Sequence, residues 1–566
     1  MKRRPLALFD FFARICTMPP LLRFPWVRRA AAMLGVVLLL LAVNVHINEL
    51  RSPAIGQYPG PGDSLWRSNL NQALAMSRSW LEAGIVKNNF TLHFMKPRVE
   101  DPSPGSPYVS YPPAFVLFPY AFAKVTGSTI ELEHLSRWGM LCHFVCALLA
   151  ALIVFLGAVR WGASILPTSV LAALAGTLVL LMPAAVKFFP FAWWADIVVL
   201  PFFLAMVSVE SFAPKNSRFW KFFGILLIVL GVLSDWLFFL LVLCLVLKDL
   251  SSRPRKLRPE LILVPAIYLA WHAWMVSQTG MLNALVTKME LRAGWKYQEI
   301  ALAKGLRYFW DHLESGMGTT GAMLALLLLS LTPLFALLFF FRHRFALQTS
   351  LWIETTFLLC APMLLHFLLL HQHYYEHPYE VLKLTVLVPL FWLGLLPLLA
   401  LAHTKHFALQ ILLLFFLTAS SWGIGSGYSE RISFAFSNPI SVDSVLQRRC
   451  QEVYRNSSYH EISFSPDFAT LGPLPFERQT PHPKVTEWAY MICNRQVYLS
   501  EQPEVVKDIY LAMRWKDYLQ DTPYRFVLWT AGKPDKAWEK YLRLDSGQQL
   551  GELWKHEISP EILQGK

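Results

Sequence analysis

Long apolar runs alternate with short polar segments along most of this chain. One of these runs, 219–247, is interrupted at Ser234 and Asp235, and this break predicts a tight hairpin of two short spans. The fold class is therefore an all-α polytopic membrane protein with about eleven transmembrane helices. The continuous runs long enough to cross roughly 30 Å of hydrocarbon are 30–47, 138–158, 166–185, 197–213, 261–277, 319–341, 349–370, 384–401 and 406–424.

Lys and Arg residues collect in alternate loops, and short cationic loops stay on the cytoplasmic side of a membrane. With the N-terminus inside, all the short cationic loops fall on one side only if segment 112–126 (PPAFVLFPYAFAKVT) does not cross. Its length of about 15 residues also favours a juxtamembrane or re-entrant helix. The cationic groups are Arg28 with Arg29, Arg160, Arg218 with Lys221, Lys248 with Arg258, Arg342 with Arg344, and Lys405.

The hydrophobic pattern changes after residue 424, where apolar runs shorten and charge rises. Residues 1–29 are predicted to be cytoplasmic, 30–424 to form the transmembrane domain with an extracytoplasmic loop at 48–136, and 425–566 to form an extracytoplasmic α/β domain. In that last domain, EISFS and YRFVLWT are typical of strands, and PEVVKDIYLAMRWKDYL and PDKAWEKYLRL of helices. A domain of about 140 residues is large enough to bury its own core.

Composition agrees with this organisation. The 566 residues are 55% hydrophobic and 16% charged, against about 25% charged in soluble domains. The net charge of +13 is explained by cytoplasmic loops that meet membrane lipids, so no nucleic-acid partner is inferred. Cys450 and Cys493 are the two cysteines on the predicted outer side, where a disulfide between them is expected. We expect a multi-pass protein of a bacterial inner membrane, with the tail in the periplasm.

Acidic residues in the outer loops are candidates for chemistry. Residues 63–84 predict an amphipathic surface helix that begins at Asp63 and ends at Gly84, and Asp63 is either its N-cap or a functional base. Glu49 and Asp101 are the competing carboxylates. Asp196 lies in KFFPFAWWADIVV before the fourth span, where it is either a helix cap or a site residue.

Two further segments hold polar groups between apolar runs. Asp235, at the tip of the 219–247 hairpin, suits hairpin capping or acceptor binding. The loop HQHYYEHPYEVLKL at 371–384 contains His371, His373, His377 and Lys383, and ionisable groups at such a depth are usually functional. A metal site of three histidines and an interfacial aromatic cluster are the alternatives there. Segment 284–314 predicts an interfacial helix with Leu302, Leu306, Phe309 and Leu313 on one face and Lys304, Arg307, Asp311 and Glu314 on the other. Lys288, Arg292 and Lys296 form a solvated cationic face, or else meet lipid headgroups or the carrier phosphate.

The segment PYVSYPPAFVL at 107–117 follows the first outer loop, and its Tyr111-Pro112-Pro113 resembles the Tyr/Asn-Pro-Pro signature of the GT-C glycosyltransferases. The likeness is to the protein mannosyltransferases and aminoarabinose transferases, which use a polyprenyl-phosphate sugar. Two prolines constrain the backbone, so the chain meets the bilayer surface at a set angle. The resemblance covers about residues 30–400 and depends on Asp63, Tyr111-Pro112-Pro113 and Asp196.

This resemblance implies an inverting transferase with Asp63 as the catalytic base and Asp196 as a second catalytic acid. It implies that Tyr111, Pro112, Pro113, His373, His377, Lys383 and Asp235 bind substrate. His373, His377 and Lys383 would lie near the carrier phosphate, but Asp235 stands where related bacterial enzymes have a cation. The donor is then a polyprenyl-phosphate sugar, and the acceptor is a lipid, glycan or protein.

No cofactor is required by this chemistry, and a divalent cation, Mg²⁺ or Mn²⁺, is left open. Asp196 lacks a paired acid, which makes strong metal binding doubtful. A transporter or flippase of lipid-linked glycans is the alternative function, and it would place polar residues in mid-span and repeat the fold internally. A sensor or assembly scaffold is a third, but it gives the carboxylates and the Pro-Pro segment no purpose.

Overall fold

The computed structural model describes most of the predicted transmembrane domain and part of the tail. The described residues are 25–52, 65–86, 90–93, 107–214, 216–252, 257–278, 282–294, 301–393, 449, 452–453, 455–456, 461–465, 497–499, 525–543 and 546–559. Asp63, Asp101, Cys450, Cys493, the predicted span at 406–424 and the predicted helix at 503–519 lie outside them.

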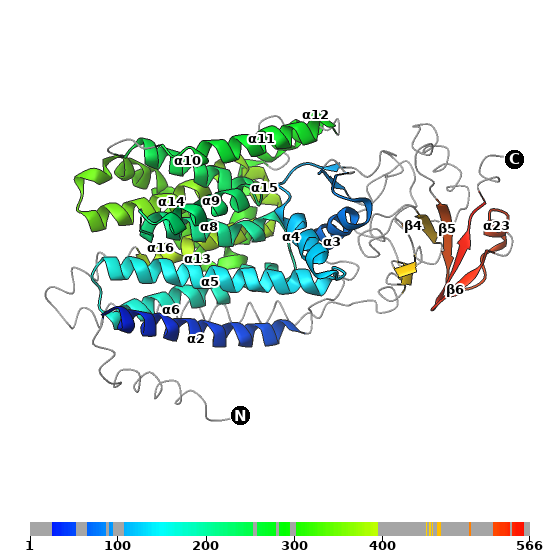
Figure 1. Cartoon of the computed structure of the whole chain (residues 1–566), viewed down its shortest axis with the longest axis horizontal. Helices are drawn as coiled ribbons and strands as arrows, with labels where there is room; N and C mark the ends of the chain where they lie inside the picture. The colour runs from blue at the N-terminus through cyan, green and yellow to red at the C-terminus, as the bar shows by residue number, and fades with distance from the viewer. Residues whose placement is uncertain are drawn as a thin grey trace, which may run out of the picture.

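Most of the described residues form a helical bundle (Figure 1). Six of its helices are long and apolar enough to cross a membrane: α2 (Pro25–Arg51), α5 (Leu132–Arg160), α8 (Ala195–Phe212), α11 (Glu260–Gln278), α13 (Leu302–Phe341) and α14 (Leu347–Leu369). Shorter apolar helices pack among them: α6 (Ile165–Leu181), α9 (Arg218–Val232) and α10 (Trp236–Leu250). The break at Ser234 and Asp235 separates α9 from α10, which confirms the predicted hairpin. The region 384–393 is not one long helix but the end of a 3₁₀ helix, η4 (Pro378–Leu387), followed by α16 (Val388–Leu393).

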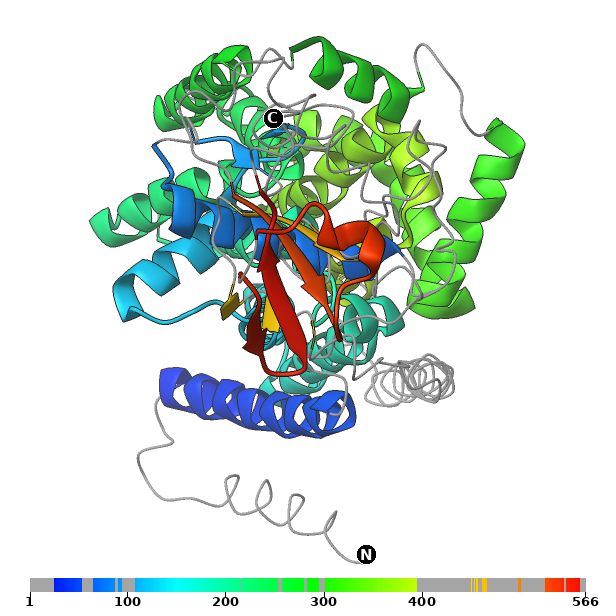
Figure 2. The same ribbon diagram turned by 90° about the vertical axis from the view of Figure 1, so that its right-hand side faces the viewer.

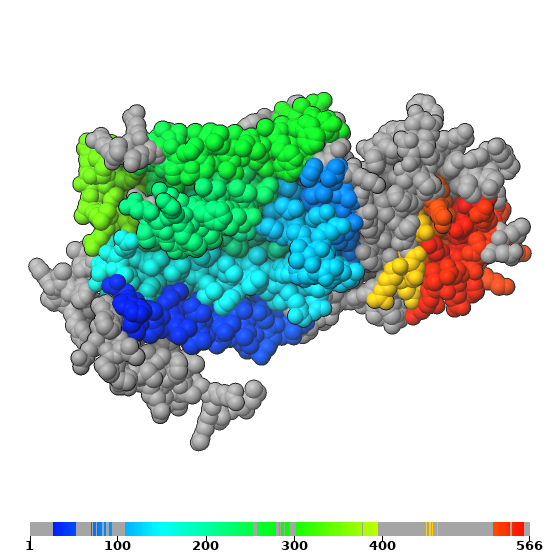
Figure 3. Space-filling model, viewed as in Figure 1, coloured from blue at the N-terminus to red at the C-terminus, as the bar shows by residue number. Residues whose placement is uncertain are grey.

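Helix α2 lies on the surface of the bundle, where Figure 3 shows it in dark blue. Leu34, Leu38, Leu41 and Val45 are 58%, 44%, 43% and 50% exposed. Their spacing of three or four residues places them on one stripe of the helix. Such a stripe of exposed aliphatic side chains is expected of a helix that faces lipid.

Short elements gather at the end of the bundle where α2 ends and α8 begins, which we call the outer end. They are α3 (Leu65–Ala83), the two-stranded pair β1 (Leu92–His93) and β2 (Pro107–Tyr108), α4 (Ala114–Thr126), α7 (Pro183–Phe188), α12 (Leu282–Ala293) and α15 (His371–Glu376). Helix α3 confirms that a helix forms in 63–84, and Gly84 follows it with φ +86°. Its predicted surface position is wrong, because Ser77, Arg78 and Trp80 are all at most 2% exposed. The 13 residues of α4 confirm that segment 112–126 is too short to cross. The opposite end is called the inner end.

The predicted interfacial helix at 284–314 is only partly correct. The structure has α12 and then the first half of α13, which bends at Gly318 where φ is +72°. Leu302 and Leu306 are 58% and 48% exposed, so they do not form the packed face. That face instead consists of Gly305, Phe309 and Leu313, because Gly305 leaves room for the ring of Tyr375.

The tail contains a five-stranded sheet with the order β4-β3-β5-β7-β6. Its strands are β3 (Glu461–Ser465), β4 (Val497–Leu499), β5 (Arg525–Thr530), β6 (Gln548–Leu550) and β7 (Leu553–Glu557), with the short helix α23 (Lys536–Glu539) before β6. Strand β3 pairs in parallel with β4 and β5, and β7 pairs antiparallel with β5 and β6. The strands predicted at EISFS and YRFVLWT are confirmed, and Trp529 and Trp538 are buried. Figure 2 views the molecule from the sheet's end, with the strands in front of the helices.

Candidate functional site

The Tyr-Pro-Pro segment is held by hydrogen bonds to the α9–α10 hairpin and to the chain before α8. Pro112 and Pro113 have no N–H, so the first N–H after them belongs to Ala114, which donates to the carbonyl of Leu233 at 2.9 Å. Two indole groups hold the carbonyls on either side: Trp236 Nε1 donates to Ser110 O at 2.8 Å, and Trp193 Nε1 donates to Phe115 O at 2.7 Å. The segment is therefore a fixed, buried wall.

Lys383 lies behind this wall among three carboxylates. Its Nζ is 2.5 Å from Asp196 Oδ1, 2.9 Å from Glu380 Oε2 and 3.5 Å from Asp235 Oδ2. His366 Nε2 is 3.3 Å from the same Nζ. We call Lys383, Asp196, Asp235, Glu380, His366 and His373 the outer cluster. Its members come from α8, the α9–α10 turn, α14, α15 and η4, so only the folded bundle assembles it.

The 3₁₀ geometry of η4 explains how two of these groups meet. With three residues per turn, side chains three apart lie directly above one another. Glu380 and Lys383 are three apart, as are His377 and Glu380. Pro378 occupies the first turn, where its fixed φ suits a helix start. An α-helix would also keep residues three apart on one face, but it would align them less directly.

Asp196 and Asp235 both lie where a helix begins, at the favourable end of the helix dipole. Asp235 is the N-cap of α10, and its Oδ1 accepts a hydrogen bond from Leu237 N at 2.7 Å. Asp196 is in the first turn of α8, whose N-cap is Trp194, so the interpretation of Asp196 as a cap is wrong. Gly139 of α5 allows the chain that precedes α8 to pack closely against α5, because a Cβ at Gly139 would lie 1.8 Å from Phe189 O.

His373 connects the Tyr-Pro-Pro segment to the cluster. Its Nε2 is 2.7 Å from Tyr111 Oη and 2.8 Å from Glu380 Oε1. Burial, and then the charges of Arg292 and Lys383, lowers the pKa of His373 well below its usual range, so this imidazole is neutral. The ring of His377 is 4.3 Å from that of His373, and burial, followed by His373, lowers the pKa of His377 to about 3.

The outer cluster carries more negative than positive charge. Three carboxylates face one ammonium, and the side chains of Asp196, Asp235, Glu380 and Lys383 are at most 2% exposed. Burial lowers the pKa of Lys383, but Asp196, Asp235 and Glu380 outweigh it and leave that pKa well above its usual range. Burial raises the pKa of Asp235, and Lys383 opposes the change. Such an unbalanced buried group attracts a proton or a cationic substrate region.

A second cation lies across the Tyr-Pro-Pro wall. The guanidinium carbon of Arg292, from α12, is 5.0 Å from the centre of the Tyr111 ring, a distance typical of a cation–π contact. Arg292 is half-buried. The aromatic surroundings are completed by Tyr108, stacked on Tyr111 at 6.3 Å, and by Trp194, whose ring is 5.5 Å from that of Tyr108.

The structure thus brings together most of the residues that the sequence singles out. Tyr111, Asp196, Asp235, His373 and Lys383 are in one buried group, Pro112 and Pro113 are buried next to it, and His377 touches it through His373. Glu49, the competing base, is exposed at the end of α2, 3.8 Å from His46 Nδ1. The position of Asp63 relative to the cluster lies outside the described residues.

Two members of the site, Glu380 and His366, were not assigned a role from the sequence, and the role of Arg292 was left between alternatives. Glu380 was visible in the 371–384 loop, and its spacing of three from Lys383 is informative only once the 3₁₀ helix is known. His366 lies inside an apolar span, where a lone histidine gives little signal. For Arg292 the sequence favoured a solvated cationic face over contact with lipid headgroups or the carrier phosphate, and its place at Tyr111 contradicts the solvated face.

A divalent metal has no arranged site in the part of the chain that the structure describes, where no three His, Cys, Asp or Glu residues are placed to hold one. In the outer cluster the three carboxylates converge on Lys383 Nζ, which fills the position a cation would take. The three-histidine alternative is not supported either, because the ring of His371 packs on Tyr375 instead.

Comparison with known proteins gives structural matches only. No protein-family model matches the chain, and no curated protein sequence does. The structure is similar to ArnT from Cupriavidus metallidurans in the apo state, with 12% identity, a TM-score of 0.47 and coverage of 93% of this chain and 98% of that one.

It is also similar to the Archaeoglobus fulgidus oligosaccharyltransferase. For the complex with Zn and sulfate, identity is 12%, the TM-score 0.43 and the coverage 87% of this chain and 67% of that one. For the apo form the identity is 11% and the TM-score is 0.44, and the match covers 88% of this chain and 69% of that one.

Proposed function

We propose that this protein is an inverting glycosyltransferase that moves a sugar from a polyprenyl-phosphate carrier to an acceptor at the outer end of the bundle. The observation that supports this best is the outer cluster, where buried carboxylates meet at helix starts beside the Tyr-Pro-Pro wall. Apolar helices on the lipid side provide a surface for the carrier. The ionisable residues of the cluster lie in the end turns of helices, in the hairpin turn and in the 3₁₀ helix η4 at the outer end, which favours a transferase over a flippase with polar mid-span groups.

The proposed reaction has one displacement at the sugar. The acceptor nucleophile attacks the anomeric carbon, its proton passes to Asp63, and the bond from that carbon to the carrier phosphate breaks with inversion. Asp196 faces the developing positive charge of the sugar ring. Lys383 holds Asp196 in place through their 2.5 Å ion pair and favours its ionised form, against the burial that raises the pKa of Asp196 to about 7.

In this proposal the carrier phosphate is not bound by Lys383. Lys383 is enclosed by three carboxylates, and a phosphate beside them would be repelled. Arg292 is half-buried at the outer surface of the Tyr111 ring and offers a planar fork of N–H donors, which suits phosphate. Arg292 is therefore proposed to bind the carrier phosphate and to stabilise its departing charge.

Access to the cluster requires movement. Asp196 is 1% exposed and Glu380 is fully buried, so this structure is closed. A substrate reaches the carboxylates only when an element that covers them moves away, and closure of this kind excludes water from the reaction.

The test is transfer of radiolabelled sugar from a polyprenyl phosphate donor by the purified protein in vesicles. Asp63→Asn should lower the rate by at least about 100-fold, the usual contribution of a general base, while Glu49→Gln should leave it within about 2-fold. In the same assay, Arg292→Gln should raise the KM for the donor and also lower kcat, because the guanidinium both binds the phosphate and stabilises its departing charge. If Asp63→Asn kept full activity and Glu49→Gln lost it instead, Glu49 would be the base and the assignment of Asp63 would be contradicted. Donor binding without transfer in the unaltered protein would favour the flippase.

A further inference from the structure

His366 lies in the last turn of α14, where this apolar helix reaches the outer cluster. Its side chain is 1% exposed, and both ring nitrogens have close partners. Nδ1 is 3.0 Å from Tyr374 Oη, and Nε2 is 3.3 Å from Lys383 Nζ. The displacement at the sugar, as proposed above, uses neither nitrogen. A histidine buried between a phenol and an ammonium therefore calls for a role of its own.

These two contacts fix the protonation of His366. An ammonium group has three N–H donors and no acceptor, so His366 Nε2 must accept the hydrogen bond from Lys383. The ring is then neutral and carries its proton on Nδ1, which donates to Tyr374 Oη. The partner of one ring nitrogen thus sets the tautomer at the other. His366 offers the outer cluster an acceptor without a charge.

Lys383 has more neighbours than donors. Its three N–H groups face four acceptors: Asp196 Oδ1 at 2.5 Å, Glu380 Oε2 at 2.9 Å, His366 Nε2 at 3.3 Å and Asp235 Oδ2 at 3.5 Å. Three donors serve the three nearest acceptors, and Asp235 Oδ2 is left without a hydrogen-bond partner. His366 thus takes the N–H that would otherwise turn to Asp235.

We propose that His366 is a positioning residue that holds the Lys383 ammonium away from Asp235, so that Asp235 Oδ2 stays available to a hydroxyl group of the substrate. This inference rests on the proposed sugar transfer. A buried carboxylate oxygen without a partner costs stability, and a hydroxyl of the sugar or the acceptor satisfies it once the site opens. Asp235 lies beside the Tyr-Pro-Pro wall, because Ala114 N donates to Leu233 O in the same hairpin.

Charged and titratable side chains face Asp235 and His366 from the elements packed around them. They are Lys383 and Glu380 from η4, Asp196 from α8, His373 and Tyr374 from α15, and Arg292 from α12. Loss of the acceptor at His366 lets the third N–H of Lys383 turn to Asp235, and this pairing favours the ionised carboxylate. The pKa of Asp235, which burial raises to about 7, should then move down toward its usual range.

The first test measures the midpoint of thermal unfolding of the purified full-length protein between about pH 8 and about pH 5. The contribution of Asp235 is the difference between each protein and its Asp235→Asn counterpart. In the unaltered protein this contribution should rise as the pH falls, because the folded state binds the proton more tightly. His366→Leu should reduce the rise, and His366→Gln should restore it, because a carboxamide oxygen accepts the same N–H.

A full rise in His366→Leu, or a reduced rise in His366→Gln, would overturn the proposal. Tyr374→Phe provides a second variant should His366→Leu not fold. It keeps the aromatic ring and removes the acceptor of the Nδ1 proton, so it should reduce the rise in the same direction by a smaller amount. An unchanged rise in Tyr374→Phe would also contradict the proposal.

The second test is transfer of radiolabelled sugar over the same pH range. His366→Leu should lower kcat/KM by about 10-fold or more, the usual loss for one hydrogen bond to a charged group. Its rate profile should also move to lower pH, because Asp235 ionises more readily beside Lys383. His366→Gln should stay within about 3-fold of the unaltered protein. A loss in His366→Gln as large as in His366→Leu would contradict the assigned role.

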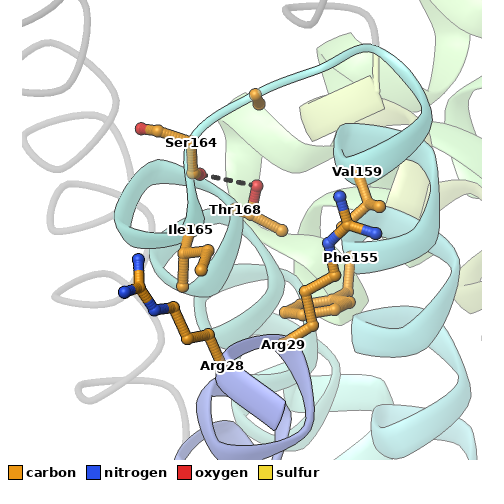
Figure 4. A pocket seen from close by; sticks show the side chains of 8 residues that line it. Arg28, Arg29, Phe155, Val159, Ser164, Ile165 and Thr168 are labelled. Carbon is orange, nitrogen blue, oxygen red and sulfur yellow. Dashed lines mark hydrogen bonds between the residues drawn. The ribbon is translucent and has the colours of Figure 1, made fainter. Parts of the chain in front are cut away.

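The control is Thr168→Val, which removes a buried hydrogen bond at the inner end. Thr168 lines a cavity of about 160 Å³ between α2, α5 and α6, and its Oγ1 donates to Ser164 O at 2.8 Å (Figure 4). Both pH profiles of this control should match those of the unaltered protein. If Thr168→Val changed them as His366→Leu does, the proposal would fail. If the unaltered protein transferred no sugar, the proposed function would fail, whereas the melting profiles would still decide the role of His366.

Discussion

The two ends of the bundle each contain a buried group of charged side chains, and the groups differ in their balance. At the inner end, three cations meet three carboxylates, and we call these the inner cluster: Lys248, Arg258 and Arg342 with Glu210, Asp249 and Glu354. Lys248 Nζ is 2.9 Å from Glu210 Oε2 and 2.5 Å from Glu354 Oε1. At the outer end, three carboxylates share Lys383.

This difference separates structural from functional charge. A buried ion pair is tolerated when each charge is compensated, and it then fixes the arrangement of helices. The inner cluster meets that condition and connects α8, α10, α14 and the chain before α11. The outer cluster keeps uncompensated negative charge that costs stability, which is typical of a site retained for chemistry.

The largest expected effect is that of Asp196→Asn on transfer. The change removes one negative charge from the unbalanced group, so we expect the rate to fall at least about 100-fold. The midpoint of thermal unfolding should stay constant or rise, because like-charge repulsion is relieved. Rates and melting curves of the purified variant provide the check.

The control for this prediction is Asp249→Asn in the inner cluster, which has the same chemistry and should retain the rate per folded molecule. If Asp196→Asn instead lowered stability and left the rate intact, the outer cluster would be structural.

Lys248→Met should have the next largest effect, and on stability only. It leaves Glu210 and Glu354 buried without their shared cation, which costs about 3–5 kcal/mol of unfolding free energy for a broken buried pair. Denaturation of the purified protein in detergent measures this loss. The surface change Lys221→Met should cost little, and a Lys248→Met variant as stable as Lys221→Met would mean that the inner cluster contributes nothing to the fold.

The pH dependence should be smaller and should have opposite signs for rate and stability. Burial raises the pKa of Asp235 in the folded protein above the value of about 3.9 that Asp has when unfolded. The folded state therefore binds this proton more tightly, so the unfolding free energy contributed by the group rises as the pH falls. Transfer needs the ionised carboxylates, so its rate should decrease over the same range, from about pH 8 to about pH 5.

Asp235→Asn should flatten both profiles, and parallel rate and melting measurements test this. A rate that increases on acidification, together with falling stability, would contradict a raised pKa at this position.

The sequence alone was sufficient for the broad organisation of the protein. Apolar runs predict the spans because backbone polar groups in lipid must be satisfied within a helix. The hairpin break, the short helix after Tyr111-Pro112-Pro113 and the strands at EISFS and YRFVLWT depend on local composition, and all were predictable. The helical state of α3 was predictable too, but its burial was not. The individual residues Tyr111, Asp196, His373 and Lys383 were also visible, since polar groups between apolar runs are rare.

Only the tertiary structure decided how those residues combine. The interpretation of Lys383 changes from a phosphate ligand to the counter-ion of three carboxylates because residues 187 positions apart, Asp196 and Lys383, pack at one helix end. Glu380 joins them through a 3₁₀ helix that local sequence did not predict, and Arg292 leaves its supposed solvated face because Tyr111 offers an aromatic surface. Hydrophobic periodicity records only whether a residue faces lipid or protein. Which charges meet inside the protein depends on distances between helices, and these arise from the packing of the whole bundle.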